Sequence, residues 1–269
     1  MPNLPGKHFF NNLIERRSLL YQLSRRDFER RFVGSAGGWL WTLIHPLVQL
    51  LVWTFIFHIC MRQPVPPGAG TENYSLFLFC GYLPWMLFQD TVSRSSTSLL
   101  DSANLITKTV FPSEMIPISV FFSSLVSHVV TVFLAILCLF IWGDGVTAQV
   151  LLIPLGVIFL SFFSIGVSWI AASFQVYLRD TAQAVTVALS LWFWVTPIFI
   201  NVNQVPEGFR AFIYANPLSV FVEAYRSCLL SSPLPAASSL IYAAAISVTT
   251  FIVGGLLFRQ LKRGFADVL

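Results

Sequence analysis

The sequence has few charged residues. Asp, Glu, Lys and Arg make up 10% of its 269 positions, whereas hydrophobic residues make up 56%. Soluble domains usually contain about 25% charged residues, and the mean hydropathy here is +0.74. The composition therefore excludes a soluble domain and predicts an all-α, polytopic membrane protein.

Cysteine is also scarce, and its copies are not spaced like metal ligands or like the half-cystines of a disulfide framework. They are Cys60, Cys80, Cys138 and Cys228, all in or beside apolar runs. We therefore expect neither a metal site nor a disulfide.

Ionisable side chains are rare within the apolar runs, which hold Asp90 at an edge and His45, His58 and His128. Ion-coupled transporters and proton pumps need buried acids or bases, so this shortage argues against them. The sequence also lacks the nucleotide-binding pattern GxxxxGK followed by Ser or Thr, and the catalytic patterns GxSxG and HExxH. A transporter built from this chain would take its energy from a separate subunit.

Runs of about 17 to 25 apolar residues can cross a bilayer. The sequence has six, at residues 39–61, 74–91, 118–142, 150–176, 182–200 and 237–258. Most of the 16 Lys and Arg residues lie before the first run, after the second and fourth, and in the tail. The positive-inside rule then gives a cytoplasmic segment at 1–38, a transmembrane domain at 39–258 and a cytoplasmic tail at 259–269.

Residues 104–117, NLITKTVFPSEMIP, separate the second and third runs. Pro112 disfavours helix at Phe111 and allows a new helix to begin at Pro112 or Ser113. Apolar side chains beside Lys108 and Glu114 are typical of a short helix that docks into another protein's groove. The alternative is an ordinary cytoplasmic turn on the lipid headgroups.

Residues 4–32 carry apolar side chains on one helical face, with Arg26 and Arg30 elsewhere. This pattern favours a helix lying on the inner leaflet; a basic segment that only sets topology is the alternative. Farther along, Asp90 and Arg94 lie one helical turn apart, which predicts an ion pair.

Two loops complete the pattern. Residues 177–180, YLRD, are so few that the helices on either side must be antiparallel neighbours, with Arg179 and Asp180 at the cytoplasmic surface or acting as a helix cap. The outer loop 201–236 holds two apolar runs, 209–214 and 218–230, that are too short to span. Runs of this length predict short re-entrant or interfacial helices in the outer leaflet.

In this order and spacing, the pieces resemble the type-2 ABC exporter permeases that move polysaccharides and polyol-phosphate polymers, such as the O-antigen, capsule and teichoic acid exporters. The resemblance covers nearly the whole chain and rests on LSRRDFERRFVGSAGGWLWTLIHPL, FCGYLPWMLF, NLITKTVFPSEMIPI, YLRD and TPIFINVNQVP…YANPLSVFVEAYR. One departure is Gly37-Gly38, where the family often has Leu-Gly before the tryptophan.

The resemblance implies an amphipathic interface helix at residues 23–31, a helix at 105–113 that couples to the ATPase, and a second ATPase contact at Arg179 and Asp180. The interface residues would be Arg25, Arg26, Asp27, Phe28 and Arg30. The coupling residues would be Leu105, Ile106, Lys108, Val110, Phe111 and Pro112. The outer gate would lie at Asn216, Pro217 and Leu218.

The resemblance also implies a homodimer bound to a separate ATPase, which holds the ATP and magnesium, so that this chain carries no cofactor. The cargo would be an O-antigen-like polysaccharide on a lipid-pyrophosphate carrier, commonly undecaprenyl. Aromatic rings that pack on sugars would line its path; the candidates are Trp53, Phe57, Trp192 and Trp194, which lipid-facing anchors would explain equally well. The same architecture exporting teichoic acid, capsule polymer or a small molecule is the alternative, and a membrane glycosyltransferase is the outsider.

Overall fold

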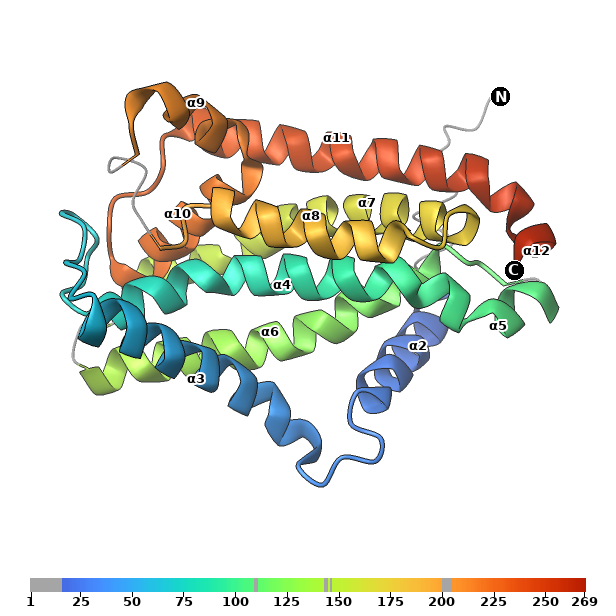
Figure 1. Cartoon of the computed structure of the whole chain (residues 1–269), viewed down its shortest axis with the longest axis horizontal. Helices are drawn as coiled ribbons and strands as arrows, with labels where there is room; N and C mark the ends of the chain where they lie inside the picture. Colours follow the sequence, from blue (N-terminus) through green and yellow to red (C-terminus); the bar gives the residue numbers. More distant parts are fainter. Residues whose placement is uncertain (1–15, 109–110, 143–144, 146, 200–204) are drawn as a thin grey trace.

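The structure is a computed structural model that describes residues 16–108, 111–142, 145, 147–199 and 205–269. Every regular element in these residues is a helix, so the all-α expectation is confirmed. The helices that run along the long axis of the molecule are α4 (Tyr74–Asp101), α6 (Met115–Trp142), α7 (Ile153–Tyr177), α8 (Thr181–Val195) and α11 (Ala237–Leu261) (Figure 1).

Shorter elements occupy the two ends of this bundle (Figure 1). The end that we call the α5 end carries α2 (Arg17–Arg30), α5 (Ala103–Lys108) and α12 (Phe265–Val268). The opposite end, the α9 end, carries α9 (Glu207–Ala215) and α10 (Pro217–Leu230). The helix α3 (Trp41–Trp53) lies obliquely on the bundle and continues as a π-helix over Thr54–Cys60. Single 3-10 turns at Gly38–Leu40, Ala148–Leu152 and Lys262–Gly264 precede α3, α7 and α12.

The helix α4 is the centre of the bundle, because it contacts α6, α7, α8 and α10. Its start is set by Asn73, whose side chain accepts a hydrogen bond from the backbone N–H of Ser75 at 3.0 Å, as an N-cap residue does. Its side chains are buried along most of its length, and Leu78, Cys80 and Leu83 have no exposed surface.

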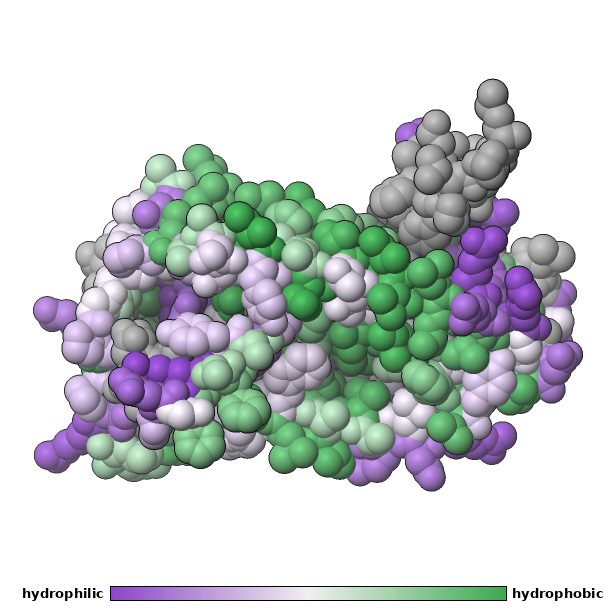
Figure 2. All heavy atoms as spheres, turned by 90° about the horizontal axis from the view of Figure 1, so that it is seen from above, coloured by the Kyte–Doolittle hydropathy of each residue, from purple (hydrophilic) through white to green (hydrophobic). Residues whose placement is uncertain are grey.

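Four segments are long and apolar enough to cross a membrane: Gly38–Cys60, Met115–Ile141, Ala148–Tyr177 and Ala237–Gly264. They confirm four of the predicted runs. Figure 2 shows hydrophobic atoms over the middle of the molecule and hydrophilic atoms gathered toward its ends. The chain is therefore a multi-pass membrane protein. The remaining runs correspond to α4, which continues well past residue 91, and to α8, which has 15 residues.

A close approach joins α7 and α11 at two glycines. A Cβ atom added at Gly254 would lie 2.3 Å from the carbonyl oxygen of Gly166, and one added at Gly166 would lie 2.5 Å from the carbonyl oxygen of Thr250. Small residues at such crossings let two membrane helices pack backbone against backbone. The two glycines therefore set the distance between α7 and α11.

We expect Gly254→Ala to lower the apparent melting temperature of the purified protein, because the helices must separate; overpacking of this kind costs about 1–3 kcal/mol. Gly208→Ala on α9 is the control, since nothing lies within 4 Å of its added Cβ atom. Thermal unfolding of both variants in the same detergent checks this. A Gly254→Ala protein as stable as the control would show that this contact does not determine the packing.

Candidate functional site

The α5 end holds the residues predicted to meet a partner protein. Leu105 and Ile106 are half-buried on α5, whereas Lys108 at its end is exposed. Phe111 and Pro112 are half-buried as well, and Ile106 and Phe111 pack against the core of the bundle. Part of the apolar surface that was predicted to contact the partner protein is therefore packed against the chain's own core. Val110 lies outside the described residues.

The helix after this segment begins at Met115, later than Pro112 or Ser113, so the predicted start is wrong. The backbone N–H of Met115 donates to the carbonyl of Pro112 at 2.9 Å, and that of Ile116 donates to Ser113 at 3.1 Å. These bonds form a turn that carries the chain from α5 into α6. Proline is accommodated in this turn because its fixed φ suits turns as well as helix starts.

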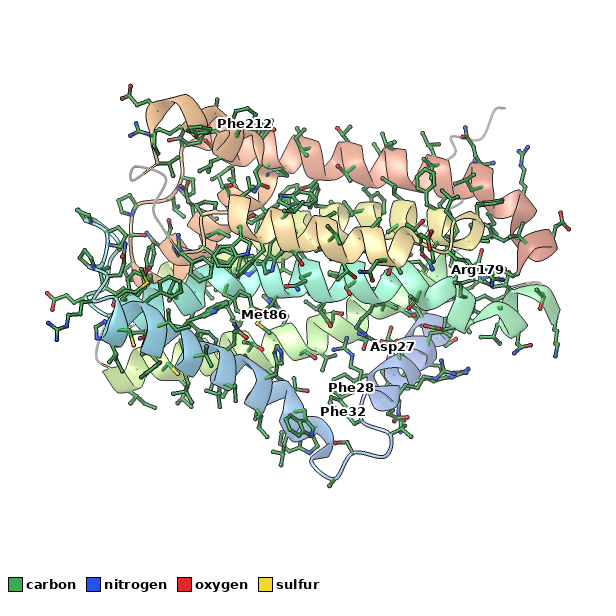
Figure 3. The ribbon with its side chains drawn as sticks, viewed as in Figure 1. Asp27, Phe28, Phe32, Met86, Arg179 and Phe212 are labelled. Carbon is green, nitrogen blue, oxygen red and sulfur yellow. The ribbon has the colours of Figure 1, made fainter. Side chains whose placement is uncertain are left out.

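The turn between α7 and α8 is fixed by Gln175, a buried side chain that the sequence reading missed. Its amide donates to the carbonyl of Arg179 at 2.8 Å and accepts from the N–H of Ala182 at 2.5 Å. Asp180 occupies the N-cap position of α8 but makes no capping hydrogen bond through its side chain. Arg179 and Asp180 are both exposed, and Figure 3 shows Arg179 at the α5 end. Their side chains are thus presented outward.

The C-terminal segment braces the same end. Lys262 forms an ion pair with Glu114 at 2.5 Å, and Trp169 on α7 donates to the Glu114 carbonyl at 3.1 Å. The hydroxyl of Tyr177 donates to the carbonyl of Leu261 at 2.8 Å, and α12 contacts α5. The start of α6, the end of α7 and the C-terminal helix therefore form one rigid cluster.

A network of charges ties α2 to the bundle. Asp27 on α2 accepts a hydrogen bond from Arg94 on α4, and Arg94 lies 3.6 Å from Asp90. Arg31, just after α2, pairs with Asp90 at 3.0 Å and donates to Ser124 on α6 at 3.0 Å. The predicted Asp90–Arg94 pair is confirmed. It belongs to a larger network, with the Arg94–Asp27 and Arg31–Asp90 pairs, that was not predicted from the sequence.

The remaining surface of α2 is free for other contacts. Phe28 packs edge-on against Phe32 at 5.1 Å between ring centroids, and Figure 3 shows both on the same side of the molecule as Asp27. Tyr21 is 67% exposed. The exposed basic side chains of α2 are Arg17, Arg25, Arg26 and Arg30. The helix thus has one face packed on α6 and one cationic face.

The predicted path residues lie toward the α9 end in different environments. Trp53 is buried at 8% exposure and packs edge-on against Tyr82 at 4.5 Å between centroids. Phe57 is half-buried and stacks on Phe199 at 4.9 Å. Trp194 is 70% exposed. Of the four aromatic candidates, Trp194 has the largest surface available to a cargo or to lipid.

The fourth candidate, Trp192, is joined to the predicted gate. Its indole N–H donates to the Asn216 side-chain oxygen at 2.9 Å, and that oxygen also accepts from the N–H of Leu218 at 3.1 Å. The Asn216 amide donates to Thr196 at 3.0 Å. Asn216 is thus the N-cap of α10, with Pro217 at the first helical position, where its missing N–H costs nothing. The structure therefore connects the end of α8 to the start of α10.

Arg226 is the principal residue that the sequence reading missed. It is 6% exposed, and its guanidinium donates to the carbonyls of Phe77, Pro197 and Ile198, at 3.3 Å to Phe77 and 2.9 Å to Pro197. Its carbon atom also lies 3.7 Å from the centroid of the Phe77 ring. Gly81 gives it room, since a Cβ atom there would lie 2.6 Å from the guanidinium. A lone Arg within the apolar run 218–230 was the signal for it.

No group of three or more His, Cys, Asp or Glu side chains in the described residues is arranged to hold a metal ion. None of the four cysteines forms a disulfide; Cys60 is exposed, and Cys80, Cys138 and Cys228 are buried. The described residues thus form an apolar helical bundle with hydrophilic ends, which is the arrangement of a multi-pass membrane protein.

The comparisons with known proteins agree. The chain matches the family model "ABC-2 type transporter" over residues 18–230. It is 30% identical to the O-antigen export system permease protein RfbA of Myxococcus xanthus, covering 95% of this chain and 96% of that protein. It is 31% identical to RfbA of Klebsiella pneumoniae, covering 93% and 95%. It is 23% identical to the polysialic acid transport protein KpsM of Escherichia coli, covering 87% and 90%. The chain belongs to the ABC-2 type transporter family.

Proposed function

We propose that this chain is the permease subunit of an ATP-driven exporter that moves a lipid-linked polysaccharide of the O-antigen type across the bacterial inner membrane. The observation that carries the proposal is the similarity to O-antigen export permeases over nearly the full length of both chains. The apolar helical bundle supports the proposal, because a polymer needs a transmembrane conduit. The sequence has no nucleotide-binding pattern of its own, so a separate subunit would hydrolyse the ATP.

We propose six membrane spans, the four apolar segments together with α4 and α8. With 28 residues, α4 is long enough, and its burial among four neighbours means that its surface need not be as apolar as a lipid-facing helix. With 15 residues, α8 is about 22 Å long, short of the roughly 30 Å hydrocarbon layer. The re-entrant helices α9 and α10, tied to its end through Asn216, would complete the outer part of this span.

The α5 end would be the cytoplasmic docking surface for the ATPase. The exposed Lys108, Arg179 and Asp180 and the half-buried Leu105 would contact the ATPase directly. The cationic face of α2 would lie at the inner leaflet, where Arg side chains meet anionic lipid. Both termini would then be cytoplasmic, in keeping with the basic residues at this end.

A second copy of the chain would complete the conduit. The helix α3, the π-helix that continues it and α8 carry large exposed apolar side chains, including Leu51, Phe55, Leu191 and Trp194. We propose that these faces meet their copies across a two-fold axis and that Trp194 packs on passing sugar rings. The wall of the conduit behind Trp194 would be formed by Trp53, Phe57 and Trp192. The outer gate would be formed by Asn216, Pro217 and Leu218.

Removing the gene from its host should abolish the surface polysaccharide and leave lipid-linked polymer inside the cell, because synthesis continues while export stops. Immunoblotting of surface polymer and extraction of the carrier-linked fraction measure both. Restoration by the wild-type gene is the control. Undiminished surface polymer in the deletion strain would refute the proposal.

Reversing the charge of Arg179 should weaken the complex with the ATPase roughly tenfold, about 1.4 kcal/mol, because this exposed side chain makes no intramolecular ion pair among the described residues. The matched control is Arg62→Glu, an exposed Arg on the loop at the α9 end. Co-purification and stimulated ATP hydrolysis are the readouts. Equal losses for Arg179→Glu and Arg62→Glu, or none for either, would contradict the assignment.

A further inference from the structure

The segment that follows α11, residues 262–269, turns back against the bundle at the α5 end. It passes through the 3-10 helix Lys262–Gly264 and continues as α12, which contacts both α5 and α7 (Figure 1). The helix α5 and the turn at residues 177–180, which follows α7, are the two elements that would dock on the ATPase. The segment 262–269 therefore touches both docking elements from inside the protein.

An ion pair ties the first docking element to this segment. Lys262 lies 2.5 Å from the carboxylate of Glu114, which directly precedes α6. The two side chains are 36% and 24% exposed, so the pair is partly shielded from water. Trp169 on α7 donates to the backbone carbonyl of Glu114 at 3.1 Å, which fixes the backbone at the same point. The chain that leads from α5 into α6 is thus held by α7 and by the segment 262–269.

The turn between α7 and α8 is tied to the same segment. The hydroxyl of Tyr177, the last residue of α7, donates to the carbonyl of Leu261 at 2.8 Å. The Tyr177 ring packs against Phe265 on α12 at 6.1 Å between centroids. Gly264 permits this approach, because a Cβ atom there would lie 2.6 Å from the Tyr177 hydroxyl oxygen. These contacts fix the start of the exposed turn that carries Arg179.

Phe265 anchors the segment to the bundle. It is 1% exposed and packs edge-on against Phe258 of α11 at 5.4 Å between centroids. Leu269 is half-buried and packs against the same core, whereas Arg263 and Asp267 are exposed. Burial of an aromatic ring is a large apolar contribution to packing. The segment is therefore attached firmly enough to hold the elements that it touches.

We propose that the segment 262–269 is a clamp that holds the two ATPase docking elements at a fixed spacing, with Lys262 and Phe265 as its positioning residues. The identity of the partner rests on the proposed function; the contacts that form the clamp do not. A rigid partner that binds two independently moving elements must order both, whereas a pair that is already ordered avoids this cost. The clamp would therefore strengthen ATPase binding without contacting the ATPase.

A double-mutant cycle tests the ion pair, with the full-length permease in lipid nanodiscs and the purified nucleotide-binding subunit of its host as the probe. Lys262→Met and Glu114→Gln should each weaken binding roughly tenfold. The double variant should bind no more weakly than either single variant, because both changes break the same contact. Losses that multiply in the double variant would mean that the two side chains contact the ATPase separately, and would overturn the inference.

Arg263→Met is the matched control, because it removes a cation from the neighbouring position. Arg263 is exposed and forms no ion pair among the described residues, so this variant should bind the ATPase as the wild type does. A loss as large as that of Lys262→Met would show that the charge of the segment matters and its contact with Glu114 does not. That result would contradict the clamp.

Hydrogen–deuterium exchange of the permease alone separates a local clamp from a general loss of stability. In Lys262→Met and in Phe265→Leu, residues 103–108 and 177–181 should exchange severalfold faster than in the wild type, because local opening of both elements becomes easier. Residues 217–230, at the opposite end of the molecule, should exchange as in the wild type. Faster exchange throughout the chain, or unchanged exchange at both docking elements, would overturn the inference.

The exchange measurement needs no ATPase, so failure of the clamp can be told from failure of the proposed function. Wild-type permease that does not bind the nucleotide-binding subunit, with the exchange pattern as expected, would contradict only the proposed function. Wild-type permease that binds it, with Lys262→Met that binds equally well and exchanges as the wild type does, would contradict only the clamp.

Discussion

The α9 end of the molecule depends on one buried guanidinium, that of Arg226. The helix α8 ends at Val195, and the chain continues through Pro197 without a helical partner for its carbonyls. Unpaired backbone groups at membrane depth are costly unless they are buried against protein donors, and Arg226 provides those donors. The same side chain reaches α4 through Phe77, so one residue fastens α10 to both α4 and the end of α8.

The opposite end is braced by charge pairs rather than by one residue. Asp27 and Arg31 fasten α2 to α4 and α6, and Lys262 fastens the C-terminal segment to the start of α6. Partly buried pairs of this kind hold their elements in a defined orientation, since breaking one leaves a charge without its partner. The helix α4 contacts α5 at this end and Arg226, through Phe77, at the other. The helix α4 therefore connects the two ends of the molecule.

Much of this arrangement could be predicted from the sequence, because long apolar runs and basic loops follow simple rules. The turn at Arg179 and the two short helices of the outer loop were predicted in place, whereas the helix expected over residues 105–113 spans only Ala103–Lys108. What could not be predicted depends on distant contacts. Arg226 and Asp27 each find partners through tertiary packing. Gln175, by contrast, bonds within the turn that follows it, and the start of α6 shifted because Pro112 sits in a turn. The burial of Trp53 likewise follows from its neighbours and not from its own segment.

The central claim is that the α5 end faces the cytoplasm and the α9 end faces outward. Cysteine labelling tests it most directly, in a background without native cysteines because Cys60 is exposed. Glu207→Cys and Arg179→Cys place one exposed thiol at each end. An impermeant maleimide added to intact spheroplasts should label Glu207→Cys at once and Arg179→Cys only after lysis. Labelling of Arg179→Cys in intact spheroplasts, with Glu207→Cys protected until lysis, would contradict the account.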